Sequence, residues 1–250
     1  MTPDERVKAA REKINRILLS LRTLLQLRSV NEIVLYSNTL SKQVGTSYAA
    51  NAYNVLTGAL FESELVRICA LWDPTRSEQA ACDRDSIPAV AWLIDSDAVA
   101  DALVADIVFA AQNMKVHWAG KNKPSEDIRR WTQQRRDVEA QEEGARARLR
   151  IDEVKKKIAE TERSNLQRSL RNFRDKHIAH ALVETKAEKK GKVETPRHGH
   201  EAELFEASVD IVNDLLYVLT NASFHWAEAR KQTARCSGAL LSRCKLNILE

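Results

Sequence analysis

Apolar residues recur every three or four positions through several long stretches of this chain, and that spacing constrains the fold more than any other feature. Such intervals return side chains to the same face of an α-helix. The clearest example lies between Pro3 and Arg28, where arginine and lysine residues, Lys13 among them, are expected to face solvent. The apolar residues of this first predicted helix are Val7, Ala10, Ile14, Ile17, Leu18, Leu21, Leu24 and Leu25.

Residues that favour other fold classes are scarce. The 250 residues include seven glycines and five prolines, too few for the many tight turns of a β-sandwich or β-barrel. We therefore predict an all-α protein, with one helical-bundle domain over residues 1–250 that is long enough to bury a substantial core.

The same periodicity, with start and stop signals, places the other helices. Residues 47–72 are apolar on nearly every side, which predicts a buried helix at the centre of the bundle. Asp73-Pro74 should end that helix, because the residue before a proline avoids the α region. Residues 75–86 are polar and predicted to be an irregular connection, with Ser86 capping the next helix. The remaining predicted helices cover residues 31–42, 86–94, 97–118, 169–184 and 203–230.

Two polar segments depart from this pattern. Residues 120–168 are crowded with charged side chains and interrupted by Gly144, which predicts a long charged helical insertion. A solvated helix pair, a coiled-coil-like arm and a surface for a partner all fit its composition. Residues 185–202 combine lysine, glycine and proline, which predicts a mobile loop.

Several classes of protein are disfavoured. No apolar run approaches the roughly 18 residues of a membrane-spanning helix, and the charged N-terminal segment lacks the apolar core of a signal peptide. Cys69, Cys82, Cys236 and Cys244 show no paired spacing, so we expect reduced thiols. No metal-ligand or phosphate-cradling motif stands out, and no metal or cofactor is expected. Together these features predict a cytoplasmic protein that does not enter the membrane.

The segment most indicative of function is Arg-Asn-Phe-Arg-Asp-Lys-His-Ile-Ala-His at residues 171–180. Histidine titrates near neutral pH and can move the proton of a ribose 2′-OH or of a leaving oxygen. A guanidinium is always charged and fork-shaped, so it can hold a phosphate and stabilise charge that accumulates there. Arginine and histidine together therefore supply groups for RNA cleavage without a metal.

The spacing adds moderate specificity. An arginine followed four to six residues later by histidine is expected roughly once or twice by chance, whereas requiring Asn, Asp or His directly after the arginine lowers that number to about 0.2. A structural interpretation stays open, in which Leu166, Leu170 and Phe173 form the core face of a helix and the arginines its solvated face. The stricter pattern occurs in two overlapping registers, Arg171-Asn172-x4-His177 and Arg174-Asp175-x4-His180.

Residues 171–180 resemble the signature of the HEPN superfamily (higher eukaryotes and prokaryotes nucleotide-binding domains), in which an arginine, a polar residue, variable positions and a histidine lie in a small helical bundle. The chain is most similar to the AbiU-type abortive-infection branch. The similarity is carried by residues 173–180 and, upstream, by Leu71-Trp72-Asp73-Pro74 followed by Asp85-Ser86-Ile87-Pro88. These blocks extend it over most of the chain.

The resemblance implies a HEPN-like fold and a metal-independent endoribonuclease that leaves a 2′,3′-cyclic phosphate, used in phage defence or as a toxin. It also implies a homodimer whose arginines and histidines line one cleft. Helix geometry makes a second copy useful, because residues six apart on a straight α-helix lie about 120° round the axis and about 9 Å along it. A two-fold partner would supply further groups nearby.

The resemblance favours the second register, since Ile178-Ala179-His180 matches the hydrophobic–small–histidine ending usual in the family. Arg174 would then bind phosphate, His180 would transfer the proton, and Asp175 would orient both by hydrogen bonding. The first register supplies the alternative or auxiliary set, which is Arg171, Asn172 and His177.

Positive charge concentrates around this segment, although the net charge of the chain is a modest +4. Arg168, Lys176 and Lys186 are expected to bind RNA. We expect RNA as substrate, a second copy of the chain as partner, and an antitoxin or regulatory protein as a further partner. The alternative function is a catalytically inactive helical module that binds RNA, nucleotide or protein through the charged insertion.

Overall fold

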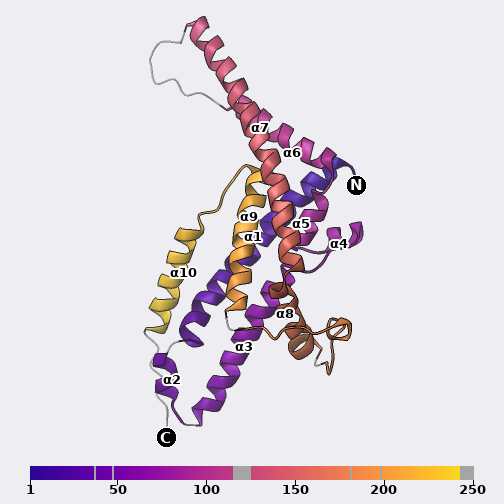
Figure 1. Cartoon of the computed structure of the whole chain (residues 1–250). Helices are drawn as coiled ribbons and strands as arrows, with labels where there is room; N and C mark the ends of the chain where they lie inside the picture. Colours follow the sequence, from indigo (N-terminus) through magenta and orange to yellow (C-terminus); the bar gives the residue numbers. More distant parts are fainter. Residues whose placement is uncertain (37, 47, 115–124, 181, 198, 243–250) are drawn as a thin grey trace.

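The computed structural model describes residues 1–36, 38–46, 48–114, 125–180, 182–197 and 199–242, and within those ranges every regular element is a helix (Figure 1). The all-α prediction is thereby confirmed. None of these described helices is both long and apolar enough to cross a membrane. The elements are α1 (Pro3–Val34), α2 (Asn38–Val44), α3 (Ala49–Ala70), α4 (Glu78–Asp83), α5 (Ile87–Leu93), α6 (Asp97–Gln112), α7 (Glu126–Arg163), α8 (Asn165–Phe173), the π-helix η1 (Arg174–Ala179), the 3-10 helix η2 (Glu188–Lys190), α9 (His200–Thr220) and α10 (Trp226–Leu241).

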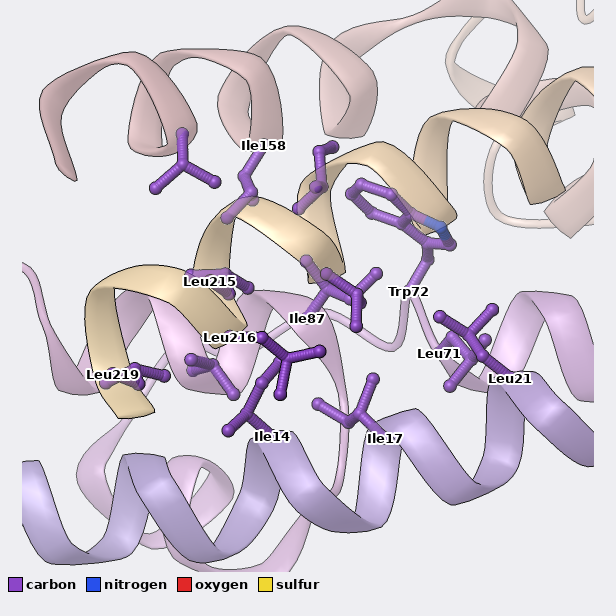
Figure 2. Packing of buried hydrophobic residues seen from close by; sticks show 14 of the residues in the cluster. Ile14, Ile17, Leu21, Leu71, Trp72, Ile87, Ile158, Leu215, Leu216 and Leu219 are labelled. Atoms are coloured by element: carbon purple, nitrogen blue, oxygen red, sulfur yellow. The ribbon is translucent and has the colours of Figure 1, made fainter. Parts of the chain in front are cut away.

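The core forms where α1 and α9 pack together, with α7, α5 and the end of α3 covering them (Figure 2). Of the eight apolar residues predicted for the first helix, all but Leu18 are buried, and Leu18 is partly buried. Full burial of a valine, leucine or isoleucine side chain stabilises the fold by about 1.5–3 kcal/mol relative to exposure. Figure 2 shows their neighbours from distant parts of the sequence: Leu71, Trp72, Ile87, Ile158, Leu215, Leu216 and Leu219.

Several boundaries differ from the sequence prediction. Residues 75–86 contain the short helix α4, which Ser77 caps by accepting a hydrogen bond from the Ala80 amide. The helix predicted over 203–230 is two helices, because Asn221 adopts a left-handed conformation with φ 51° and ends α9. The apolar spacing continues past that break to Trp226, which is why periodicity alone missed it. Residues 31–34 continue α1, and residues 115–118 of another predicted helix lie outside the described ranges.

Lys13 was expected to face solvent but is only 2% exposed. Its ammonium group donates to the carbonyl oxygens of Cys82 and Arg84 at 2.7 and 2.9 Å, and lies 3.3 Å from a carboxylate oxygen of Asp85. A charge can be buried when its donors are satisfied in this way. Lys13 therefore fixes the segment just before Ser86, which caps α5 as predicted.

α3 differs most from its prediction as a buried central helix. Its C-terminal half contributes Leu65, Ile68 and Cys69 to the core, but its N-terminal half extends away from the bundle (Figure 1). Val55 is 74% exposed and Leu56 52% exposed. The apolar surface of α3 exceeds what the bundle can cover, so one of its faces is left unpaired within the described chain.

The charged insertion is largely accounted for by α7, which packs along α6 and α9 from Ala140 onward (Figure 1). The first residues of the predicted insertion, 120–124, lie outside the described ranges. Gly144 does not interrupt the helix, contrary to the expectation from sequence, but lies at its contact with α6. A Cβ at this position would approach Val108 Cγ2 to 2.6 Å and Val104 Cγ1 to 3.3 Å. Glycine therefore allows the two helices to approach closely.

We expect Gly144→Ala to destabilise the fold by about 1–2 kcal/mol, because the overpacking cost exceeds the gain in helix propensity. Urea denaturation of the pure protein measures this change. Gly238→Ala in α10 is the matched control, since nothing lies within 4 Å of the position that the added methyl group would occupy, and it should stabilise by about 0.5–1 kcal/mol. Equal effects of the same sign would contradict the close-packing role of Gly144.

Candidate active site

The two sequence blocks that carry the HEPN resemblance meet in space, where the end of α3 faces α8 and η1. Arg171 donates a hydrogen bond to the carbonyl oxygen of Trp72. The next residue along the chain, Asp73, lies with its Oδ1 3.3 Å from Arg174 Nη1. Arg171 and Arg174 thus connect α8 and η1 to residues that lie about 100 positions earlier in the chain.

The remainder of the upstream block holds this arrangement in place. The Ile87 amide donates to the carbonyl oxygen of Leu71 at 2.8 Å. Ser86, besides capping α5, donates its hydroxyl to the carbonyl oxygen of Asp73 at 2.9 Å. The start of α5 therefore fixes the backbone on which Asp73 is carried.

The helix that carries the motif changes its winding inside the motif. α8 ends at Phe173, and residues Arg174–Ala179 form a π-helix, which is wider than an α-helix and is frequent at functional sites. His180 follows with φ −135° and ψ −7°, outside helical geometry. The amide of Leu182 donates to the carbonyl oxygen of Lys176 at 2.8 Å and closes the turn. The α-helix predicted over 169–184 is therefore wrong beyond Phe173, and so is the straight-helix estimate of the Arg–His separation.

Arg174 is held between two carboxylates. Its Nε and Nη2 donate to Asp175 Oδ1 at 2.9 and 2.8 Å, while Nη1 faces Asp73, and the side chain is 17% exposed. Burial opposes its charge, but the Asp175 hydrogen bonds and the charges of Asp175 and Asp73 outweigh that effect and raise the Arg174 pKa. The fork is thus fixed and fully charged, and it keeps N–H donors for a further anion.

Arg171 has a different environment. Burial lowers its pKa, and the neighbouring Arg174 charge lowers it further. Its Nε is buried without a hydrogen-bond partner among the described residues. Arg171 therefore has the character of a packing residue that holds the Trp72 backbone.

Both histidines of the motif are exposed. The His177 ring packs against Phe173 with 4.8 Å between centroids, and Phe173 in turn meets Phe61 of α3 edge-on. The His180 side chain makes no hydrogen bond with any residue in the described ranges. The structure thus brings the Asp175 carboxylate to Arg174 but forms no hydrogen bond between the side chains of Asp175 and His180.

Asn172 and Lys176 are engaged by a residue that the sequence analysis missed. Glu188 Oε1 accepts from Asn172 Nδ2 at 3.1 Å and from Lys176 Nζ at 3.0 Å. Thr185 donates its hydroxyl to Asn172 Oδ1, and Thr185 and Glu188 each accept from the amide of the other. This reciprocal pair has the hydrogen-bond pattern of a capping box, although η2 itself begins only at Glu188, and the spacing Thr-x-x-Glu was the signal present in the sequence.

These contacts also bear on the segment predicted as a loop. Residues 188–190 of this segment form η2, Thr185 and Glu188 attach it to α8 and η1, and its last three residues belong to α9, which begins at His200. Of the predicted RNA-binding residues, Arg168 and Lys186 are exposed, whereas Lys176 forms an ion pair with Glu188.

Cys69 is buried beside the two arginines. Burial raises the pKa of its thiol to about 12, although the charges of Arg174 and Arg171 oppose that shift. A thiol at such a pKa stays protonated at neutral pH and is a poor nucleophile. Cys69, Cys82 and Cys236 form no disulfide, and Cys244 lies outside the described ranges.

The Glu188 contacts predict a defined pH dependence. Hydrogen bonds from the Thr185 amide, Lys176 and Asn172 lower the Glu188 pKa to about 2, from about 4.3 in an unfolded chain. A depressed folded-state pKa contributes stability above the unfolded value, and this contribution is lost as pH falls from about 4.5 toward 2. The free-energy gap between wild type and Glu188→Gln should therefore be full at pH 7 and shrink over that window, as urea denaturation would show. Glu184→Gln, an exposed neighbour, should give no such gap.

The helical bundle, with an Arg-polar-x4-His segment at the end of one helix and its arginine anchored to the end of another, has the features of a HEPN domain. The family model for AbiU2, a HEPN family, matches residues 4–237, and the chain therefore belongs to the AbiU2 family. Membership points to an abortive-infection, RNase-like role. No curated protein and no solved structure matches the chain.

Proposed function

We propose that this protein is a metal-independent endoribonuclease of the HEPN type, which cleaves RNA at a site bordered by two protomers and serves in phage defence or as a toxin. The observation that carries the proposal is the arrangement at η1. A fully charged arginine fork is fixed by two carboxylates at the start of η1, and an exposed histidine follows six residues later, directly after the end of η1.

The chemistry assigns one role to each group. The ribose 2′-oxygen attacks the adjacent phosphorus, and the bond from phosphorus to the 5′-oxygen breaks. His180 moves the proton, either from the 2′-OH or to the departing 5′-oxygen. Arg174 binds the phosphate and stabilises the charge on its oxygens. The products are a 2′,3′-cyclic phosphate and a free 5′-hydroxyl, so atoms and charges balance without an external reactant.

The environments of the two registers support Arg174, Asp175 and His180 as the catalytic set. Asp175 orients the Arg174 fork directly. Arg171 is committed to the Trp72 carbonyl oxygen, and Asn172 to the 185–188 turn. We therefore assign the first register, with His177 on the Phe173 ring, to positioning of the turn. Arg168 and Lys186 extend the positive surface along which RNA is drawn to the site.

The test is cleavage of RNA by purified protein in the presence of a chelator, with the ends of the products identified. Cyclic-phosphate ends that require both Arg174 and His180 support the proposal. RNA binding without cleavage by the unmutated chain would instead favour a catalytically silent binding module. Growth arrest on expression, lost in both variants, is the matching test in cells, and its relief by a co-expressed neighbouring gene would identify an antitoxin.

A further inference from the structure

Three aromatic rings from three helices of the candidate site form a row that ends in solvent. The Phe61 ring of α3 meets the Phe173 ring of α8 edge-on, with 6.5 Å between centroids and 78° between the ring planes. The Phe173 ring in turn contacts the His177 imidazole of η1, with 4.8 Å between centroids and 47° between the planes. We call these three residues the aromatic row.

The two ends of the aromatic row have opposite environments. Phe61 and Phe173 are partly buried and pack against the hydrophobic core. His177 is exposed, and its side chain makes no hydrogen bond with any residue in the described part of the chain. The core therefore fixes Phe173, and Phe173 supports the imidazole from one side while the rest of that ring remains open to a ligand.

The exposed end of the aromatic row lies beside the groups that are assigned to cleavage. His177 follows Arg174 by three residues and precedes His180 by three. Three residues rise only about 4.5 Å along an α-helix, a distance shorter than an extended arginine side chain. A phosphate held by Arg174 and a base lying on His177 can therefore belong to the same nucleotide or to adjacent ones.

An exposed ring that is supported from behind suits an unpaired nucleobase. The bases of single-stranded RNA stack on Phe, Tyr, Trp or His side chains, whereas the bases of a duplex are already stacked on one another. Stacking of this kind accepts every base, because each base has a π face. The ring therefore distinguishes unpaired from paired RNA without reading its sequence.

Proton transfer explains the position of His177 less well. The other members of its register have structural contacts, since Arg171 binds a backbone carbonyl oxygen and Asn172 binds the 185–188 turn. A proton-transferring imidazole needs a hydrogen-bonding partner rather than an aromatic ring behind it. Support by Phe173 is what a stacking surface requires.

We propose that His177 is a stacking platform for an unpaired base of the RNA substrate, beside the phosphate that Arg174 holds. The platform selects single-stranded RNA, or the unpaired loop of a folded RNA, over paired stretches. This inference rests on the proposed function for its substrate, but the platform can be tested without cleavage.

The test measures binding of a strand that cannot be cleaved, by fluorescence anisotropy. In 2′-O-methyl oligoadenylate the attacking hydroxyl is blocked and the bases remain, whereas an abasic strand with the same backbone lacks the bases. We expect the unmutated chain to bind oligoadenylate at least about tenfold more tightly than the abasic strand. His177→Ala should abolish that difference, and its effect on cleavage should fall on KM rather than on kcat. His177→Phe keeps an aromatic face but cannot transfer a proton, and should retain the difference.

Two control variants separate stacking from packing and from charge. His177→Leu still packs on Phe173 but offers no π face, so it should bind like His177→Ala. His225→Ala removes an exposed histidine at the start of α10, which packs on α1, and should bind like the unmutated chain. Unchanged circular dichroism and melting temperature show that each variant folds.

The outcomes distinguish the platform from the ribonuclease. Equal binding of both strands by the unmutated chain overturns the platform, and so does a preference for bases that survives in His177→Leu or disappears in His177→Phe. Cleavage of ordinary RNA by a chain that binds both strands equally removes the platform and leaves the ribonuclease. Base-dependent binding through His177 without any cleavage upholds the platform and removes the ribonuclease instead.

Discussion

Replacing Arg174 or His180 by alanine is expected to lower the rate of RNA cleavage by about 10²- to 10⁴-fold, and His180→Ala should do so with little change in the stability of the fold. These magnitudes are typical for loss of a group that stabilises transition-state charge or transfers a proton. The His180 side chain is exposed and makes no hydrogen bond within the described ranges, so its truncation leaves no buried partner unsatisfied. Single-turnover cleavage of a labelled RNA, beside urea denaturation of each variant, separates the two effects.

Matched variants make this prediction specific to the register. His177→Ala removes the other exposed histidine of the motif, which packs on Phe173, and should lower the cleavage rate less than about tenfold if His180 moves the proton. Arg174→Lys keeps the charge but loses the fork that Asp175 and Asp73 hold, and should therefore recover little activity. If the loss followed His177 rather than His180, the first register would be catalytic. Equal cleavage by all variants would point to a contaminating nuclease.

Trp72→Ala is expected to have the largest effect on stability, about 3–5 kcal/mol. The Trp72 side chain is fully buried among residues of the core (Figure 2), and its indole Nε1 donates to Ser208 Oγ at 2.8 Å. Its carbonyl oxygen accepts from Arg171, and Asp73 follows it directly. One residue therefore anchors the site to the core, and its truncation should lower activity together with stability. For a chain of this size the melting temperature should fall by roughly 10 °C.

Two substitutions test this explanation. Trp72→Phe keeps most of the buried volume but removes the donor to Ser208, whose hydroxyl still donates to Leu204, so it should cost about 1–2 kcal/mol. Trp131→Ala truncates a tryptophan that is 60% exposed, and should change stability by less than about 0.5 kcal/mol. A Trp72→Ala variant that melts like wild type would show that this junction does not depend on the indole.

The sequence predicted the positions of the helices better than the contacts that the helices make. Periodicity located α1 and its buried face, and Ser86 and Asp73-Pro74 marked the start of α5 and the end of α3. The same periodicity failed at Asn221 and at Phe173, because an Asn in the left-handed region and a π-turn interrupt a helix without interrupting the apolar spacing. It also misassigned α3, since an apolar face predicts burial but does not say whether the same chain provides the cover.

By itself, then, the sequence determined the helical class, the family signature at 171–180 and the candidate residues within it, because these depend on local spacing and residue type. Tertiary structure alone decided which groups those residues meet. Asp73 and Glu188 became part of the site only because α3 and the 185–188 turn pack against α8 and η1. Lys13 became buried because the segment after α4 folds over α1. Such pairings join positions far apart in the chain, and no local pattern of residues encodes the distance between them.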